Sequence, residues 1–107
     1  MARIFTFCSA IIALCLFFSI AGKAVSATPG EAGFKKNCAV CHPDGGNIMN
    51  AKKTLHKKDM DAHNVKTAGD IIKLMRKPGP GMTAFDANTV PDKDAKEIAD
   101  YILTTFK

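Results

Sequence analysis

The chain is poor in the residues that a nucleic-acid-binding surface needs. None of its 107 residues is tryptophan, one is tyrosine, and Arg76 is the only arginine after Arg3. The formal net charge of +5 therefore rests on lysines, without the arginine-rich or aromatic patches of nucleic-acid-binding proteins. We accordingly expect no nucleic-acid partner.

Strand-like alternation of useful length, internal repeats, low-complexity tracts and linkers are also missing. Their absence argues against a sheet, a repeat array or several domains. Four stretches instead carry helical patterns: about 30–41, about 51–55 with a further short turn reaching His63, 68–77, and from about 92 to the C-terminal end. We therefore predict an all-α fold of about four helices.

Local signals mark where these helices begin and end. Thr28 is a candidate N-cap with Pro29 at the first helical position, Thr67 is the candidate cap of the third helix, and Pro78 ends that helix. The last two helices also carry apolar residues at helical spacing. These form the predicted core: Ile71, Ile72, Leu74, Met75, Ala95, Ile98, Ala99, Ile102, Leu103 and Phe106.

Residues 1–27 have the parts of a secretory signal peptide: Arg3, an apolar run over 4–21, and a small-residue cleavage site ending at Ala27. We expect cleavage there, which leaves one domain over 28–107 in the bacterial periplasm or, as an alternative, in the thylakoid lumen. An uncleaved segment would anchor the domain to the membrane, facing the periplasm, because its apolar run of about 18 residues is long enough to span.

Only two cysteines, Cys38 and Cys41, remain after signal cleavage. A zinc finger would have to complete its ligands with His56 and His63, and no βαβ pattern points to a thioredoxin-like pair. With His42 the two cysteines form Cys-x-x-Cys-His, the pattern by which haem is attached covalently. The thiols can bond two vinyl groups of a porphyrin, and the adjacent imidazole can bind iron. The motif predicts one haem c and no structural disulfide.

A second axial ligand is expected from segment 77–85, which two prolines and two glycines keep out of a helix. It carries Met82, 40 residues after His42. A thioether ligand favours Fe(II) and raises the reduction potential. The other residues that remain open for this position are Met49, Met60, Met75, His56 and His63.

These residues together resemble a class I c-type cytochrome, in particular the small soluble single-haem branch that includes algal cytochrome c-six. Gly30 and Phe34 stand eight and four positions before Cys38, where the family places the residues that cross the last helix. Ile98 and Tyr101 resemble their partners. Independently of the likeness, Gly30 allows two helices to approach closely, and Phe34 and Tyr101 can pack edge to face.

Two further segments are similar to the family. Residues 45–47 and 53–55 resemble its stretch after the haem motif. Residues 81–85, Gly-Met-Thr-Ala-Phe, resemble its ligand loop. Thr83 stands in place of the common proline, which leaves the rigidity of the loop to Pro78 and Pro80.

The resemblance implies a non-enzymatic carrier that passes single electrons between redox proteins, with His42 and Met82 as axial ligands. We expect a monomer whose transient protein donor and acceptor dock near Lys52, Lys53, Lys57 and Lys58. Two alternatives remain open: a haem enzyme or gas or redox sensor with an open sixth position, and an accessory subunit of a larger respiratory complex. The expected haem-pocket wall comprises Phe85, Ile71, Leu74, Ile98 and Ile102.

Overall fold

The computed structural model describes Gly22 and residues 26–107. They form four α-helices, α1 (Pro29–Asn37), α2 (Lys57–Ala62), α3 (Ala68–Arg76) and α4 (Asp92–Thr105), and one turn of 3₁₀ helix, η1 (Pro43–Gly45). These described residues contain no β-strand, so the all-α prediction is confirmed. The predicted signal segment, 1–27, lies outside the described residues except for three of its positions.

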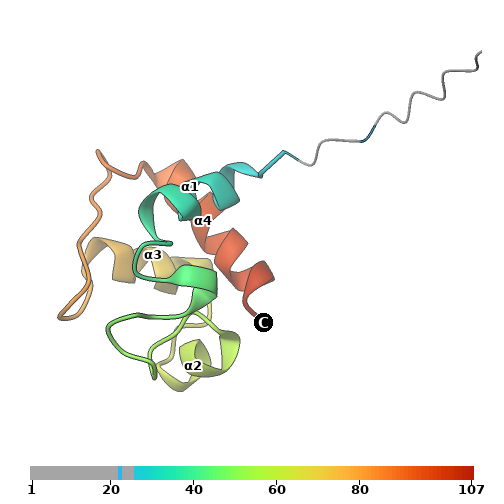
Figure 1. Ribbon diagram of the computed structural model, residues 1–107. Helices are drawn as coiled ribbons and strands as arrows, with labels where there is room; N and C mark the ends of the chain where they lie inside the picture. The colour runs from blue at the N-terminus through green and yellow to red at the C-terminus, as the bar shows by residue number, and fades with distance from the viewer. Residues whose placement is uncertain (1–21, 23–25) are drawn as a thin grey trace, which may run out of the picture.

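Helix α4 is the centre of the packing, because both α1 and α3 contact it. Figure 1 shows α2 at the far end of the molecule from α1, and the loop between α3 and α4, coloured orange, running along one side. No helix in the described part of the chain is both long and apolar enough to cross a membrane.

The crossing of α1 and α4 depends on Gly30, as predicted. A Cβ atom at this position would collide with the backbone carbonyl of Glu97 on α4. The Phe34 and Tyr101 rings lie 5.4 Å apart at 49°, which corrects the predicted edge-to-face pair. Phe106 packs against both rings: its ring lies 5.3 Å from Phe34 and meets Tyr101 edge to face at 84°. Three aromatic rings therefore close this crossing.

Helix α1 is shorter than predicted. It ends at Asn37, whereas the pattern placed Cys41 inside it. The N–H groups of Cys38 and Ala39 both donate to the Phe34 carbonyl, at 2.8 and 3.0 Å. The second of these bonds joins residues that are five positions apart, so the regular hydrogen-bond pattern of the α-helix ends here. The haem-attachment motif consequently begins at the helix end and continues as turns.

The predicted short helix over 51–55 is wrong. Asparagine side chains hold these backbone groups instead: Asn50 Oδ1 accepts from the Lys52 N–H at 3.0 Å, and Asn47 Nδ2 donates to the Lys53 carbonyl at 2.8 Å. Such local side-chain bonds compete with the helical ladder. The helix of this region is α2, at the position of the predicted turn ending near His63.

The predicted caps and core are largely confirmed. The Thr28 and Thr67 hydroxyls accept from the N–H groups of Glu31 and Asp70, and α3 ends two residues before Pro78. Ile72 and Leu103 are only partly buried, and Leu74 is exposed. The buried core comprises Phe34, Met60, Ile71, Met75, Val90, Ala95, Ile98, Ala99, Ile102 and Phe106.

Candidate functional site

A cavity of about 350 Å³ opens among α2, α3, the end of α4 and the loops between them. Its charged and hydrogen-bonding side chains all come from one stretch of chain, residues 42–63. The wall contributed by residues 65–102 is apolar. These lining residues are Cys38, His42, Asn47, Lys53, Thr54, Leu55, Asp59, Met60, His63, Val65, Ile71, Leu74, Met75, Gly79, Pro80, Met82 and Ile102.

The two cysteines of the motif differ in exposure. Cys38 lines the cavity and is partly buried, whereas Cys41 is exposed and does not line it. Burial raises the pKa of the Cys38 thiol to about 11, and the nearby Cys41 adds to the rise. Redox-active and metal-binding cysteines need a lowered thiol pKa. Cys38 therefore does not have the lowered thiol pKa of such cysteines.

His42 is oriented by the turn that follows it. Its Nδ1 donates to the Gly46 carbonyl at 2.7 Å, which leaves Nε2 of the neutral ring without a proton and able to bind a metal. The turn is tight because Gly45 has φ +79°, and a Cβ atom there would lie 2.5 Å from the Phe106 ring. The aromatic cluster thus supports the turn that orients the imidazole.

Met82 reaches the same cavity from the loop between α3 and α4. Gly81 precedes it with φ +89°, a backbone conformation that glycine adopts without strain. Met82 is 37% exposed, and Leu74, also in the wall, is 41% exposed. Exposed apolar residues that gather in one hollow are typical of a ligand-binding site. The wall therefore fits an apolar ligand.

The other candidates for the second ligand separate into two groups. Met60, Met75 and His63 line the cavity, whereas Met49 and His56 do not. Both lining methionines are buried on helices, and His63 Nδ1 bonds the Asp59 carbonyl at 2.8 Å. Met82 alone among the cavity's methionines lies in a loop.

The predicted pocket wall is right in three positions out of five. Ile71, Leu74 and Ile102 line the cavity. Ile98 lies instead in the core, where its side chain faces Gly33 of α1. Phe85 packs against the core from the loop side.

Sequence reasoning placed Asn47 in a loop that resembles the family but did not predict the hydrogen bonds of its side chain. Its Oδ1 accepts from the N–H groups of Met49 and Asn50 at 2.9 and 3.0 Å, and its amide holds the Lys53 carbonyl. One side chain therefore orders the segment 47–53 at the cavity. An asparagine directly after a glycine pair is a known turn signal, and it could have identified this role.

The residues that line the cavity indicate which kind of cofactor it can hold. Within the described residues, no three His, Cys, Asp or Glu side chains gather closely enough to hold a metal ion by themselves. Two imidazoles (His42 and His63), one cysteine sulfur and three methionine sulfurs share the cavity, which has a polar side and a larger apolar side. These residues fit a flat, largely apolar macrocycle that bears two carboxylates and brings its own metal.

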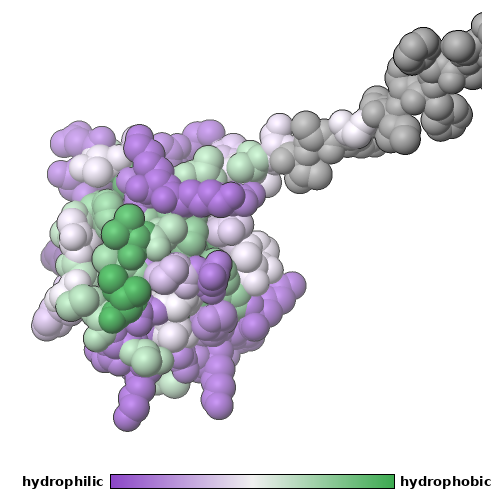
Figure 2. Space-filling model, viewed as in Figure 1, coloured by the Kyte–Doolittle hydropathy of each residue, from purple (hydrophilic) through white to green (hydrophobic). Residues whose placement is uncertain are grey.

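Three large apolar residues outside the cavity are also exposed: Val40, Ile48 and Met49. The Ile48 N–H donates to the Cys41 carbonyl at 3.0 Å, so this segment lies against the motif. Figure 2 shows a compact group of strongly apolar side chains on the surface of the molecule, bordered by hydrophilic ones.

Comparison with known proteins agrees with this site. Residues 25–102 match the family described as cytochrome c oxidase, cbb3-type, subunit III. Cytochrome c6 of Nostoc sp. is 34% identical over 104 residues, covering 96% of this chain and 93% of the relative. Cytochrome c6 of Thermosynechococcus vestitus is 32% identical over 101 residues, covering 94% and 89%.

Solved structures agree as well. OmcF, outer membrane cytochrome F from Geobacter sulfurreducens, superposes with a TM-score of 0.71 at 38% identity, covering 73% of this chain and 99% of that one. Cytochrome c6C from Synechococcus sp. gives a TM-score of 0.69 at 25% identity, covering 74% and 95%. The resemblance drawn from the sequence is thereby confirmed. The chain belongs to the small class I c-type cytochromes of the cytochrome c6 kind, which are electron carriers and not enzymes, and its cofactor is one covalently attached haem c.

Proposed function

We propose that residues 28–107, released from the signal segment 1–27, carry single electrons between redox proteins outside the cytoplasm. Cys38 and Cys41 would hold the haem through thioether bonds, and His42 and Met82 would be its axial ligands. The bacterial periplasm is the proposed compartment.

The observation that carries this proposal is the cavity that His42 and Met82 both line. His42 has one ring nitrogen engaged with Gly46, which leaves the other for the metal. Met82 lies in a loop on the apolar side of the cavity. Haem iron with two protein ligands changes oxidation state without exchanging ligands, which suits electron transfer.

The haem, when bound, supplies the one-electron chemistry. The contribution of the chain is to keep the site rigid and dry. Ile71, Met75 and Ile102 are buried where they line the cavity, and Asn47 fixes the polar segment opposite them. An apolar surrounding limits the solvent that must reorganise when the charge on the iron changes.

We further propose that a partner with an acidic face docks beside Lys53, which lines the cavity. Among the described residues, Lys57 pairs with Asp61 at 2.6 Å, whereas Lys52, Lys53 and Lys58 pair with no carboxylate. Lys53 lines the cavity, and these three lysines leave net positive charge on the segment 52–58, which would steer such a partner.

A second candidate function has an observation of its own. The family model that matches residues 25–102 describes a subunit of the cbb3-type oxidase, which favours an accessory role in a respiratory complex. The purified chain would then exchange electrons poorly with small redox carriers. A haem enzyme or sensor would instead lack Met82 on the iron and bind carbon monoxide readily.

The ligation is tested by replacing Met82 with alanine in the haem-loaded protein. We expect the wild-type ferric protein to show the weak red absorption band of sulfur ligation. Met82→Ala should abolish this band and lower the reduction potential, because the thioether favours Fe(II). The matched control is Met49→Ala, an exposed methionine that does not line the cavity, which should leave both unchanged. A band that survives in Met82→Ala would contradict the assignment.

A further inference from the structure

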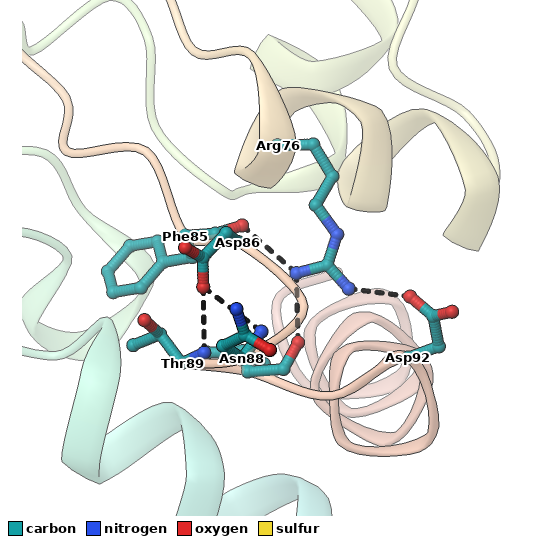
Figure 3. A network of polar contacts seen from close by, with 7 residues as sticks. Arg76, Phe85, Asp86, Asn88, Thr89 and Asp92 are labelled. Atoms are coloured by element: carbon teal, nitrogen blue, oxygen red, sulfur yellow. Dashed lines mark hydrogen bonds and ion pairs between the residues drawn. The ribbon is translucent and has the colours of Figure 1, made fainter.

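Arg76 is the last residue of α3, and its guanidinium reaches the far end of the loop that carries Met82 (Figure 3). Nη1 donates to the carbonyls of Phe85 and Val90 at 2.9 and 2.8 Å, and Nη2 donates to Asp92 Oδ1 at 2.7 Å. The Arg76 side chain is only 22% exposed, whereas Asp92 is 88% exposed. The two carbonyl bonds are therefore the better shielded part of the network.

The second half of this loop, residues 86–90, is held by its own hydrogen bonds. Asp86 Oδ1 accepts from the N–H groups of Asn88 and Thr89 at 3.0 and 2.8 Å, and the Val90 N–H donates to the Asp86 carbonyl at 2.9 Å. Val90 is also buried in the core. This half is a fixed support to which Arg76 binds.

The first half of the loop, residues 77–84, carries Met82 and has little internal support. Among the described residues, the one backbone hydrogen bond made within it joins the Met82 N–H to the Gly79 carbonyl at 3.4 Å. Gly79 and Gly81 add conformational freedom. Its far end is fixed at Phe85, whose N–H donates to the Met75 carbonyl at 2.8 Å and whose carbonyl accepts from Arg76.

We propose that Arg76 is a positioning residue for the axial thioether, a role that rests on the proposed ligation by Met82. By binding the Phe85 carbonyl, the guanidinium holds the far end of segment 77–84, which contains Met82, beside the near end of that segment at the end of α3. A short loop with fixed ends loses much of its freedom. Met82 is then presented to the haem in one arrangement, although Thr83 stands where proline would have stiffened the loop.

The arginine fork is needed for this role. Its planar donors reach two carbonyls and a carboxylate at once, and bonds from a charged donor are stronger than neutral ones. A lysine ammonium is a compact point charge and does not span the same three acceptors. We therefore expect Arg76→Lys to preserve the charge but only part of the positioning.

The test measures how easily imidazole displaces Met82 from the ferric iron of the haem-loaded protein at fixed pH. Arg76→Met keeps an unbranched side chain of similar length but removes every donor. It should bind imidazole on the order of tenfold more tightly than wild type and show a lower reduction potential. Arg76→Lys should lie between the two. Asp92→Asn removes only the exposed ion pair, and it should stay within about twofold of wild type.

The variant Thr67→Ala distinguishes a positioning role of Arg76 from a purely structural one, because it removes the N-cap at the other end of α3. If Arg76→Met and Thr67→Ala lower the denaturation midpoint alike, only Arg76→Met should alter imidazole affinity and potential. Equal imidazole affinity in Arg76→Met and wild type would overturn the positioning role while leaving the ligation intact. Absence of the sulfur band from the wild type would overturn both. Should Arg76→Met fail to fold, Arg76→Lys carries the same comparison.

Discussion

At the scale of single residues, the glycine at position 30 shows how a missing side chain determines packing. Any Cβ atom there would meet the Glu97 carbonyl on α4, and a backbone group cannot move aside without shifting the helix. Gly69, on α3, is different, because its Cβ would lie 3.6 Å from the Thr67 hydroxyl in ordinary contact. The two positions form a natural pair for substitution.

We expect Gly30→Ala to destabilise the haem-loaded protein by about 1–3 kcal/mol, the usual cost of forcing extra volume into a packed contact. Gly69→Ala should be neutral or stabilising by about 0.5–1 kcal/mol, because alanine is the better helix former. Chemical denaturation followed by far-UV circular dichroism measures both. Similar midpoints for the two variants would contradict the close approach of α1 to α4.

At the scale of elements, sequence reasoning succeeded where capping signals and apolar spacing agreed. Helix α3 begins after Thr67 and α4 begins at Asp92, as expected. The predicted helix over 51–55 was wrong because asparagine side chains outside that stretch hydrogen-bond to its backbone groups. The helix propensities of residues 51–55 do not reveal these bonds. The predicted end of α1 was wrong for a related reason. The N–H groups of Cys38 and Ala39 both donate to the Phe34 carbonyl, and the local composition does not predict this arrangement.

The cap of α3 also makes stability depend on pH. Asp70 accepts from the N–H groups of Lys66 and Thr67 at 2.9 Å each, and these bonds hold the pKa of its carboxyl below the usual value. A carboxyl whose pKa is lower when folded stabilises the protein above its unfolded pKa of about 3.9 and ceases to do so as the pH falls through the folded pKa.

We therefore expect Asp70→Asn to lower the denaturation midpoint at pH 7 and to lose less further stability than wild type as the pH falls from about 5 to below 3. Urea denaturation at a series of pH values measures this. Asp100→Asn is the control, because it removes a carboxylate on α4 that forms an ion pair but caps no helix. Parallel pH profiles for wild type and Asp70→Asn would show that the cap does not act through its charge.

At the scale of the whole molecule, the sequence predicted which residues form the site but not the hydrogen bonds that position them. Cys38, His42 and Met82 were expected together, and the structure brings all three to one cavity. The bond from His42 to Gly46 and the reach of Arg76 to Phe85 were not foreseen, because each depends on backbone carbonyls placed by folding. The sequence shows which side chains can donate hydrogen bonds, but it does not show which backbone carbonyl will accept them.

The net charge of the whole molecule also affects how a partner approaches the protein. Losing Arg3 and Lys23 with the proposed signal segment lowers the formal net charge from +5 to +3, and two haem propionates bring it nearer to zero. The overall field is then weak, so steering must come from local charge. Lys52 and Lys53 provide it beside the cavity, whereas Lys93 and Lys96 are paired within α4 with Glu97 and Asp100.

We expect Lys52→Gln/Lys53→Gln to slow oxidation of the ferrous protein by hexacyanoferrate(III), an anionic probe, severalfold at about 0.01 M salt, where the Debye length is ~30 Å. The difference should vanish near 1 M salt, where that length is ~3 Å. Lys93→Gln/Lys96→Gln removes equal charge away from the cavity and should have a much smaller effect. Equal slowing by both double variants would mean that net charge alone steers the probe and would exclude a docking role for the lysines at the cavity.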